Sequence, residues 1–257
     1  MIFETHGHYD DERFDEDREQ LCKSFLENGI DKVMNVGADM KSSRSSVQLA
    51  ATYPHFYAAV GVHPSEVGDM TEKDIEELKA MAEDNKKVVA IGEIGLDYHF
   101  DDAPSREVQR KWFVRQLELA AELNMPVVIH SRDAASDTME ILKSMDGGKN
   151  GGVIHCYSYS LPQAKEYIKM GFHIGIGGVI TFNNSKKLRE VVDGIELGSI
   201  VLETDSPYMA PVPYRGRRNC ALYIPYIAEQ IAEIKGVSTE AVYEATYRNA
   251  LKMYKMI

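Results

Sequence analysis

Two histidines one residue apart follow the first apolar run of the chain, in the sequence THGHYD. Alternate residues of a β-strand point to the same side, so His6 and His8 can both reach one small cation. The same spacing also occurs in surface turns that bind nothing, and the pair alone leaves both interpretations open. Further imidazoles and carboxylates at equivalent places would favour a metal site.

Several other apolar runs also end in side chains that can bind metals or phosphates. If these runs form the parallel strands of a barrel, their C-terminal ends meet at one side of it. Five of the eight histidines of the chain lie at such ends, which random scatter would rarely produce. Metal binding is therefore the favoured interpretation of the first pair too. The residues at these ends are His6, His8, His63, Glu93, His130, Arg132, His155 and Asp205.

The donor types predict which ions would bind and how. Imidazoles and carboxylates without thiolates suit divalent ions of the Zn, Mn, Co or Mg type. Two such ions about 3.5 to 4 Å apart need a ligand that bridges them, and the two oxygens of a carboxylate do this. We expect Glu93 to be that bridge. The other expected ligands are His6, His8 and Asp205 on one ion, and His130 and His155 on the other.

Four residues are expected to act on the substrate. Asp205 can take the proton of a metal-bound water, although a helix N-cap before Ser206 is the structural alternative. His63 and Arg132 can hydrogen-bond an oxyanion, and Arg132 can instead pair with the adjacent Asp133. Arg215 belongs to the loop PVPYRGRRN, the only basic cluster beside these residues. We expect this loop to hold phosphate, with a merely solvated loop as the alternative.

The apolar runs alternate with amphipathic or charged stretches of helical length along the whole chain. We expect strands at residues 1–5, 33–37, 56–62, 88–93, 126–130, 152–155, 173–177 and 200–203. Helices are expected at residues 12–28, 71–85 and 105–123, and two more after residue 219, on either side of a turn at 237–239. Eight such units predict an α/β protein of the TIM type, a (β/α)8 barrel in a single domain over residues 1–257.

Composition limits the classes of function. The net charge of −11, from 29 basic and 40 acidic residues, excludes a protein that coats nucleic acid through dense Lys and Arg. The sequence lacks both an apolar stretch of membrane-spanning length and the pattern of a secretory signal, so we expect a cytoplasmic protein, and a monomer. The cysteines, Cys22, Cys156 and Cys220, are widely spaced and predict free thiols.

Seven segments of the chain, in matching order, resemble the TatD-like metal-dependent deoxyribonucleases of the amidohydrolase-like superfamily. They are MIFETHGHYD, GVHP, GEIGLDYH, PVVIHSR, IHCYS, GGVITFNNS and LETDSPYMAPVPYRGRRN. The resemblance implies a (β/α)8 barrel with two divalent ions that hydrolyses phosphodiester bonds of DNA, often as a 3′–5′ exonuclease with some action on RNA. It also implies that His63 lies near the substrate phosphate. The family's metal ligands correspond to His6, His8, Glu93, His130, His155 and Asp205.

The chain departs from the usual pattern of this family at five positions. Family members commonly have Asp, Ala or Cys, His, Gly and Glu where this chain has Glu4, Gly7, Ser65, Tyr159 and Cys220. None of the five is an expected metal ligand, so we expect the hydrolytic centre to be kept. Tyr159 and Cys220 are expected near the mouth of the site, where they would affect the choice of substrate.

The sequence therefore predicts a deoxyribonuclease in which a hydroxide activated by two metals attacks a phosphodiester at a single-stranded end. Two alternatives stay open. The same centre can hydrolyse small amides, lactones or esters, because hydroxide also attacks carbon. A protein that holds metal mainly to bind a partner would share the ligand set and turn over no substrate.

Overall fold

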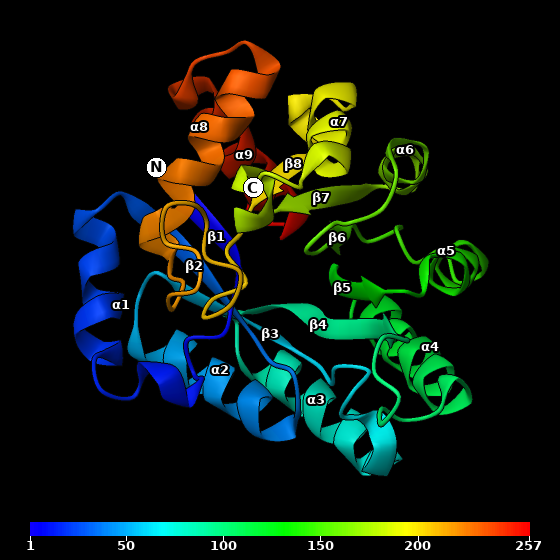
Figure 1. Ribbon diagram of the computed structural model, residues 1–257. Coiled ribbons are helices and arrows are strands. Elements are labelled where there is room, and N and C mark those ends of the chain that lie inside the picture. The colour runs from blue at the N-terminus through cyan, green and yellow to red at the C-terminus, as the bar shows by residue number, and fades with distance from the viewer.

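Eight parallel strands form one sheet in the order of the sequence, and this sheet curls into a barrel surrounded by helices (Figure 1). The computed structural model describes residues 1–257. The eight predicted strands are confirmed, with small differences at their ends, and so is the (β/α)8 fold. They are β1 (Ile2–Gly7), β2 (Ile30–Val36), β3 (Phe56–Val60), β4 (Val88–Asp97), β5 (Val127–Arg132), β6 (Gly152–Ile154), β7 (Phe172–Ile176) and β8 (Ile200–Leu202).

The barrel closes where the chain after β8 meets the end of β1. The backbone N–H of Asp205 donates to the carbonyl oxygen of His6 at 2.9 Å, and the N–H of His8 donates to that of Ser206 at 2.7 Å. These two hydrogen bonds fix the position of Asp205 relative to the histidine pair. No α-helix follows Asp205 until α8 (Ile224–Lys235), so the alternative in which this residue is a helix N-cap is wrong.

One helix follows each of the first seven strands, two follow the last, and together they cover the outside of the barrel (Figure 1). They are α1 (Arg18–Glu27), α2 (Met40–Thr52), α3 (Glu72–Asp84), α4 (Arg106–Glu122), α5 (Ala135–Ser144), α6 (Leu161–Lys169), α7 (Lys186–Gly194), α8 (Ile224–Lys235) and α9 (Thr239–Met253). None of them is both long and apolar enough to cross a membrane. The helices predicted at 71–85 and 105–123 and the last two are confirmed.

The helix predicted at residues 12–28 is shorter than expected. Residues Glu12–Phe14 form a separate 3-10 turn, and α1 starts only at Arg18. The guanidinium of Arg18 donates to the backbone carbonyls of Tyr9, Asp10 and Asp11, which holds the chain in a loop before the helix. Apolar periodicity cannot reveal this break, because a single side chain causes it.

Two clusters of buried side chains hold the barrel together. The larger one fills the space between the strands and the surrounding helices. The smaller one joins strand residues such as Phe3, Val36 and Val201 to Tyr254, just after α9. The hydroxyl of Tyr254 also donates to the carbonyl of Thr5 at 2.9 Å. The last helix therefore packs against β1, the strand that carries the histidine pair.

Strand β4 continues four residues beyond its predicted end at Glu93, as far as Asp97. This extension depends on Gly95, whose φ of +148° is rarely adopted by other residues. A Cβ atom there would lie 1.9 Å from the carbonyl oxygen of His130 on β5. The close approach of β4 and β5 brings Glu93 and Asp97 to either side of the His130 ring.

We expect Gly95→Ala to lower the free energy of unfolding by about 3 kcal/mol or more, because it combines backbone strain with a clash against β5. The matched control is Gly29→Ala, which also has positive φ, at +77°, but meets nothing within 4 Å. The control should cost only about 1 to 2 kcal/mol. Urea unfolding measures both, and equal losses would contradict the role of the close contact.

Candidate metal centre

Four candidate ligand atoms, from residues in or directly after three strands, meet at the C-terminal ends of the barrel strands. The Nε2 atoms of His6 and His8 lie 3.2 Å apart. Oε2 of Glu93 lies 3.4 Å from the first of these nitrogens and 3.8 Å from the second. Oδ1 of Asp205 lies 3.9 Å and 3.5 Å from the same two atoms. The structure thus brings together the four residues that the sequence predicts for one ion.

These separations fit a bound divalent ion. Ligand atoms held about 2.1 Å from a tetrahedral ion lie about 3.4 Å from one another, close to the five measured separations. His8 is also oriented for such a role, because its Nδ1 lies 2.8 Å from the carbonyl oxygen of Val36. A carbonyl only accepts, so Nδ1 carries the hydrogen and Nε2 of the neutral ring offers its lone pair to a metal.

A second group forms around the other oxygen of the same carboxylate. Oε1 of Glu93 lies 2.9 Å from Nδ1 of His130 and 3.3 Å from Nε2 of His155. His63 is more distant, with its Nε2 3.9 Å from this oxygen. The two oxygens of Glu93 therefore face two different sets of imidazoles, which is the arrangement that a bridging carboxylate requires.

The electrostatics of the centre favour positive charge at its middle. Burial alone would raise the pKa of Glu93, but His155 and His6 outweigh it and hold this pKa well below its ordinary value. Burial acts against protonation of His155, yet Glu93 and Glu203 raise the pKa of this imidazole well above its ordinary value. Since a metal and a proton compete for the same imidazole nitrogen, such a site suits a cation.

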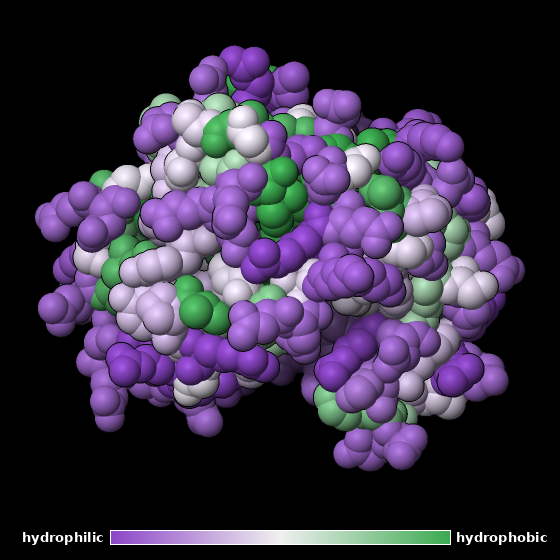
Figure 2. Space-filling view, turned by 45° about the horizontal axis from the view of Figure 1, so that its top comes forward, coloured by the Kyte–Doolittle hydropathy of each residue, from purple (hydrophilic) through white to green (hydrophobic).

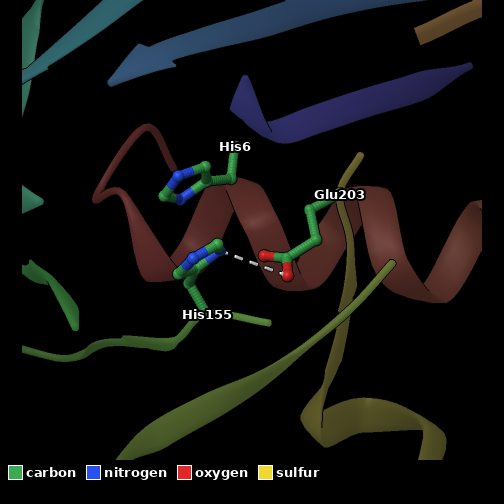
Figure 3. Close-up of side chains that lie close together, drawn as sticks. All are labelled: His6, His155 and Glu203. Carbon is green, nitrogen blue, oxygen red and sulfur yellow. Dashed lines mark ion pairs between the residues drawn. The ribbon is translucent and has the colours of Figure 1, made fainter. Parts of the chain in front are cut away.

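Two carboxylates that the sequence analysis did not predict lie against the imidazole nitrogens that face away from Glu93. Oδ2 of Asp97 accepts from Nε2 of His130 at 3.0 Å. Oε1 of Glu203 lies 3.4 Å from Nδ1 of His155, and the rings of His155 and His6 stack with centroids 3.7 Å apart (Figure 3). Such partners fix the orientation of ligand rings. Asp97 lies outside the strand that the sequence predicts at residues 88–93.

A third missed acid, Glu4, is fully buried below the histidine pair. Its Oε1 accepts from the backbone N–H groups of His6 and Thr204, at 3.1 and 2.9 Å. Burial raises the pKa of Glu4 to about 8, in spite of these hydrogen bonds. The signal for both buried acids was present in the sequence, since Glu4 and Glu203 interrupt apolar strands where an unpaired charge is costly.

The centre opens into a pocket of about 480 Å³. His63 and Arg132, which the sequence predicts as phosphate ligands, both line it. Arg132 makes no ion pair with Asp133; instead its guanidinium lies over the ring of Phe100, 5.0 Å from the centroid. The other residues that line the pocket include His8, Asp10, Asp11, Asp39, Glu66, Glu93, Asp97, His130, His155, Asp205 and Tyr208.

The remaining predicted substrate residues lie elsewhere. The guanidinium of Arg215 stacks over the ring of Phe182, 4.4 Å from the centroid, and this arginine does not line the pocket. Cys220 is buried, and the hydroxyl of Tyr159 bonds to Ser131 and to the backbone of Ala134. Neither residue lines the pocket.

Comparisons with known proteins agree with one another on the family of this chain. The model of the family described as TatD related DNase matches residues 3–255. This chain belongs to that family. Among curated proteins, the uncharacterized metal-dependent hydrolase YabD of Bacillus subtilis is 39% identical over 256 residues, which cover 100% of both chains. The 3′-5′ ssDNA/RNA exonuclease TatD of Escherichia fergusonii is 32% identical over 250 residues, 94% of each chain.

A solved structure extends the agreement to the fold. The crystal structure of YjjV, a TatD homologue from Escherichia coli, superposes with a TM-score of 0.92 at 31% sequence identity. The match covers 99% of this chain and 98% of that one. The barrel described above is therefore the fold of a TatD homologue along the whole chain.

We expect Asp97→Asn to weaken the affinity for Zn²⁺ or Mn²⁺ about 10- to 100-fold, because the amide no longer fixes the His130 ring with a full negative charge. Isothermal titration calorimetry measures this affinity. Asp133→Asn is the control, since Asp133 is exposed and pairs only with His99. If both variants bind the ions as tightly as the wild-type protein does, Asp97 has no such role.

Proposed function

We propose that this protein is a divalent-metal-dependent hydrolase that cleaves phosphodiester bonds at single-stranded DNA ends, in the 3′–5′ direction and with some action on RNA. The observation that carries the proposal is the carboxylate of Glu93, whose two oxygens face separate groups of imidazoles. The direction and the substrate are supported by the family and by the name of the Escherichia fergusonii relative.

The proposed metal ligands are the six residues that the sequence predicts. Two divalent ions of the Mg, Mn, Zn or Co type, when bound, would neutralise negative charge on the phosphate and make a water more acidic. The proposed ligands are His6, His8 and Asp205 for one ion, His130 and His155 for the other, and Glu93 for both.

Asp205 is the proposed general base. Burial would raise the pKa of this carboxyl group, but hydrogen bonding to His8 and the charges of His155 and His6 lower it. The carboxylate is therefore ionised at neutral pH and can accept a proton from the attacking water. Its position is fixed by the backbone hydrogen bond to β1, so the accepting oxygen stays beside the histidine pair.

His63 and Arg132 are the proposed contacts to the phosphate. Burial lowers the pKa of His63 to about 3, so the imidazole is neutral and can donate one hydrogen bond. Its Nδ1 accepts from the backbone N–H of Ser65 at 3.2 Å, which places the hydrogen on Nε2. That nitrogen is directed toward the metal centre, 3.9 Å from Glu93. Arg132 can add two parallel hydrogen bonds to a phosphate. Arg215 would reach the substrate only if its loop moves.

The acidic surroundings of the pocket favour ends over duplex interiors. Asp10, Asp11, Asp39 and Glu66 line the pocket, in a chain with a net charge of −11. Repulsion between these groups and a phosphate backbone grows with the number of phosphates nearby. One terminal phosphodiester that reaches the centre therefore costs less than a long duplex.

The same acidic pocket keeps one alternative open, the hydrolysis of small amides, lactones or esters. These substrates carry less negative charge than DNA, so Asp10, Asp11 and Asp39 would not repel them. The two phosphate-binding candidates at the pocket, His63 and Arg132, favour the phosphodiester.

The first test compares wild-type protein with Glu93→Gln on a 5′-labelled single-stranded DNA oligonucleotide in Mg²⁺ or Mn²⁺. We expect the wild-type protein to shorten the oligonucleotide from its 3′ end, and kcat of the variant to fall more than about 100-fold, beyond the loss seen when residues behind metal ligands are changed. Glu83→Gln, an exposed carboxylate on α3, is the matched control.

EDTA should abolish the cleavage by wild-type protein and control alike. Absence of cleavage by metal-loaded wild-type protein, or equal cleavage by wild type and Glu93→Gln, would contradict the proposal. The same proteins would then be assayed with amide, lactone and ester substrates.

A further inference from the structure

Two exposed aromatic rings lie at the pocket of the metal centre. Eight large hydrophobic side chains of this protein are exposed, and Phe100 and Tyr208 are the only aromatic ones among them. Their exposed fractions are 51% and 48%, and both rings line the pocket. Figure 2 shows that hydrophobic residues form only small separate areas on a mostly hydrophilic face. The two rings therefore stand out as apolar contacts beside the proposed reaction centre.

The two rings come from opposite sides of the barrel. Phe100 follows β4 and Tyr208 follows β8, and these strands are four apart in a ring of eight. The metal centre lies between them, since Glu93 belongs to β4 and Asp205 precedes Tyr208 by three residues. A chain that enters the pocket from solvent thus passes one ring on each side.

Each ring is paired with a guanidinium. The central carbon of Arg132 lies 5.0 Å from the ring centroid of Phe100, and that of Arg13 lies 4.2 Å from the centroid of Tyr208. Arg13 is held in place by Asp11, which accepts from its Nε at 2.9 Å. These cations steady the rings and place positive charge beside them in an otherwise acidic pocket.

We propose that Phe100 and Tyr208 form an aromatic clamp that stacks on unpaired bases of a single-stranded nucleic acid, on either side of the phosphate at the metal centre. This inference rests on the proposed function and adds a source of affinity to it. Proteins that bind single strands without sequence preference combine cations with aromatic rings, because every base presents a π-face to them. A duplex keeps its bases stacked inside and offers none to the clamp.

Stacking on the clamp can supply binding free energy that contacts to phosphates do not supply in this pocket. Binding of nucleic acid usually draws on many Lys and Arg contacts to phosphates, but Arg132 is the only Lys or Arg that lines this pocket, in a chain with a net charge of −11. Stacking does not depend on net charge, so it can hold a strand whose phosphates are repelled by Asp10, Asp39 and Glu66. Affinity should accordingly depend on the presence of bases more than on the number of phosphates.

The test measures binding and does not require turnover. Fluorescence anisotropy gives the Kd of a labelled single-stranded oligonucleotide, and of one of equal length whose 3′-terminal residues are abasic, for wild-type protein with Mg²⁺; phosphorothioate linkages in both oligonucleotides prevent cleavage. Phe100→Ala and Tyr208→Ala should each weaken binding of the normal oligonucleotide about 10-fold. Phe100→Trp keeps an aromatic ring and should bind this oligonucleotide as tightly as the wild-type protein does. The control Leu26→Ala, which changes an exposed side chain on α1, should leave the Kd unchanged.

The abasic oligonucleotide separates stacking from other effects. It should bind to the wild-type protein about as weakly as the normal one binds to the alanine variants, and those variants should weaken it no further. Equal affinity of the wild-type protein for both oligonucleotides, or unchanged affinity in both alanine variants, would overturn the clamp. Because these readouts involve no cleavage, they stand apart from the hydrolysis assay that tests the proposed function.

Discussion

The structure depends on one buried carboxylate that two groups of imidazoles share. Glu93 is only 4% exposed, and an ionised carboxylate in such a place is stable only if positive charge surrounds it. Glu93 and Glu203 raise the pKa of His155 well above its ordinary value, so protons on imidazoles such as this one can supply that charge. Replacing such protons by divalent ions would keep the balance of charge, so the requirement that stabilises Glu93 also defines a cation site.

The barrel fold brings the imidazoles that Glu93 requires to one place. The ends of the parallel strands bring the imidazoles of His6 on β1, His130 on β5 and His155, directly after β6, within 4 Å of one carboxylate on β4. The acids Glu4, within β1, and Glu203, directly after β8, are fully buried beside these imidazoles. The rigidity of the ligand set therefore comes from the sheet, whereas the loops after β4 and β8 supply the surface that a substrate meets.

The sequence predicted the strands and the six residues of the centre, because strand periodicity and chain order determine which residues end a parallel strand. It did not reveal Asp97, whose place depends on the close approach of β4 and β5 at Gly95. Nor did it place Arg215 and Cys220, since the path of an irregular loop follows from contacts such as the stacking of Arg215 on Phe182. Periodicity therefore predicts which residues lie at the strand ends, whereas positions that depend on a single side-chain contact cannot be predicted from it.

The acidic pocket needs bound cations before it can attract a phosphate. Asp10, Asp11 and Asp39 line the same pocket as Glu93 and Asp205, and these carboxylates work against the approach of a phosphate. Two divalent ions would add four positive charges at the point where their effect is largest, and would reverse the sign of the potential there while leaving the outer pocket acidic. Phosphate attraction would then be confined to a few ångströms around the ions. A substrate phosphate beyond that distance gains nothing from the centre, so any affinity for the rest of a strand must come from uncharged contacts such as those of exposed aromatic rings.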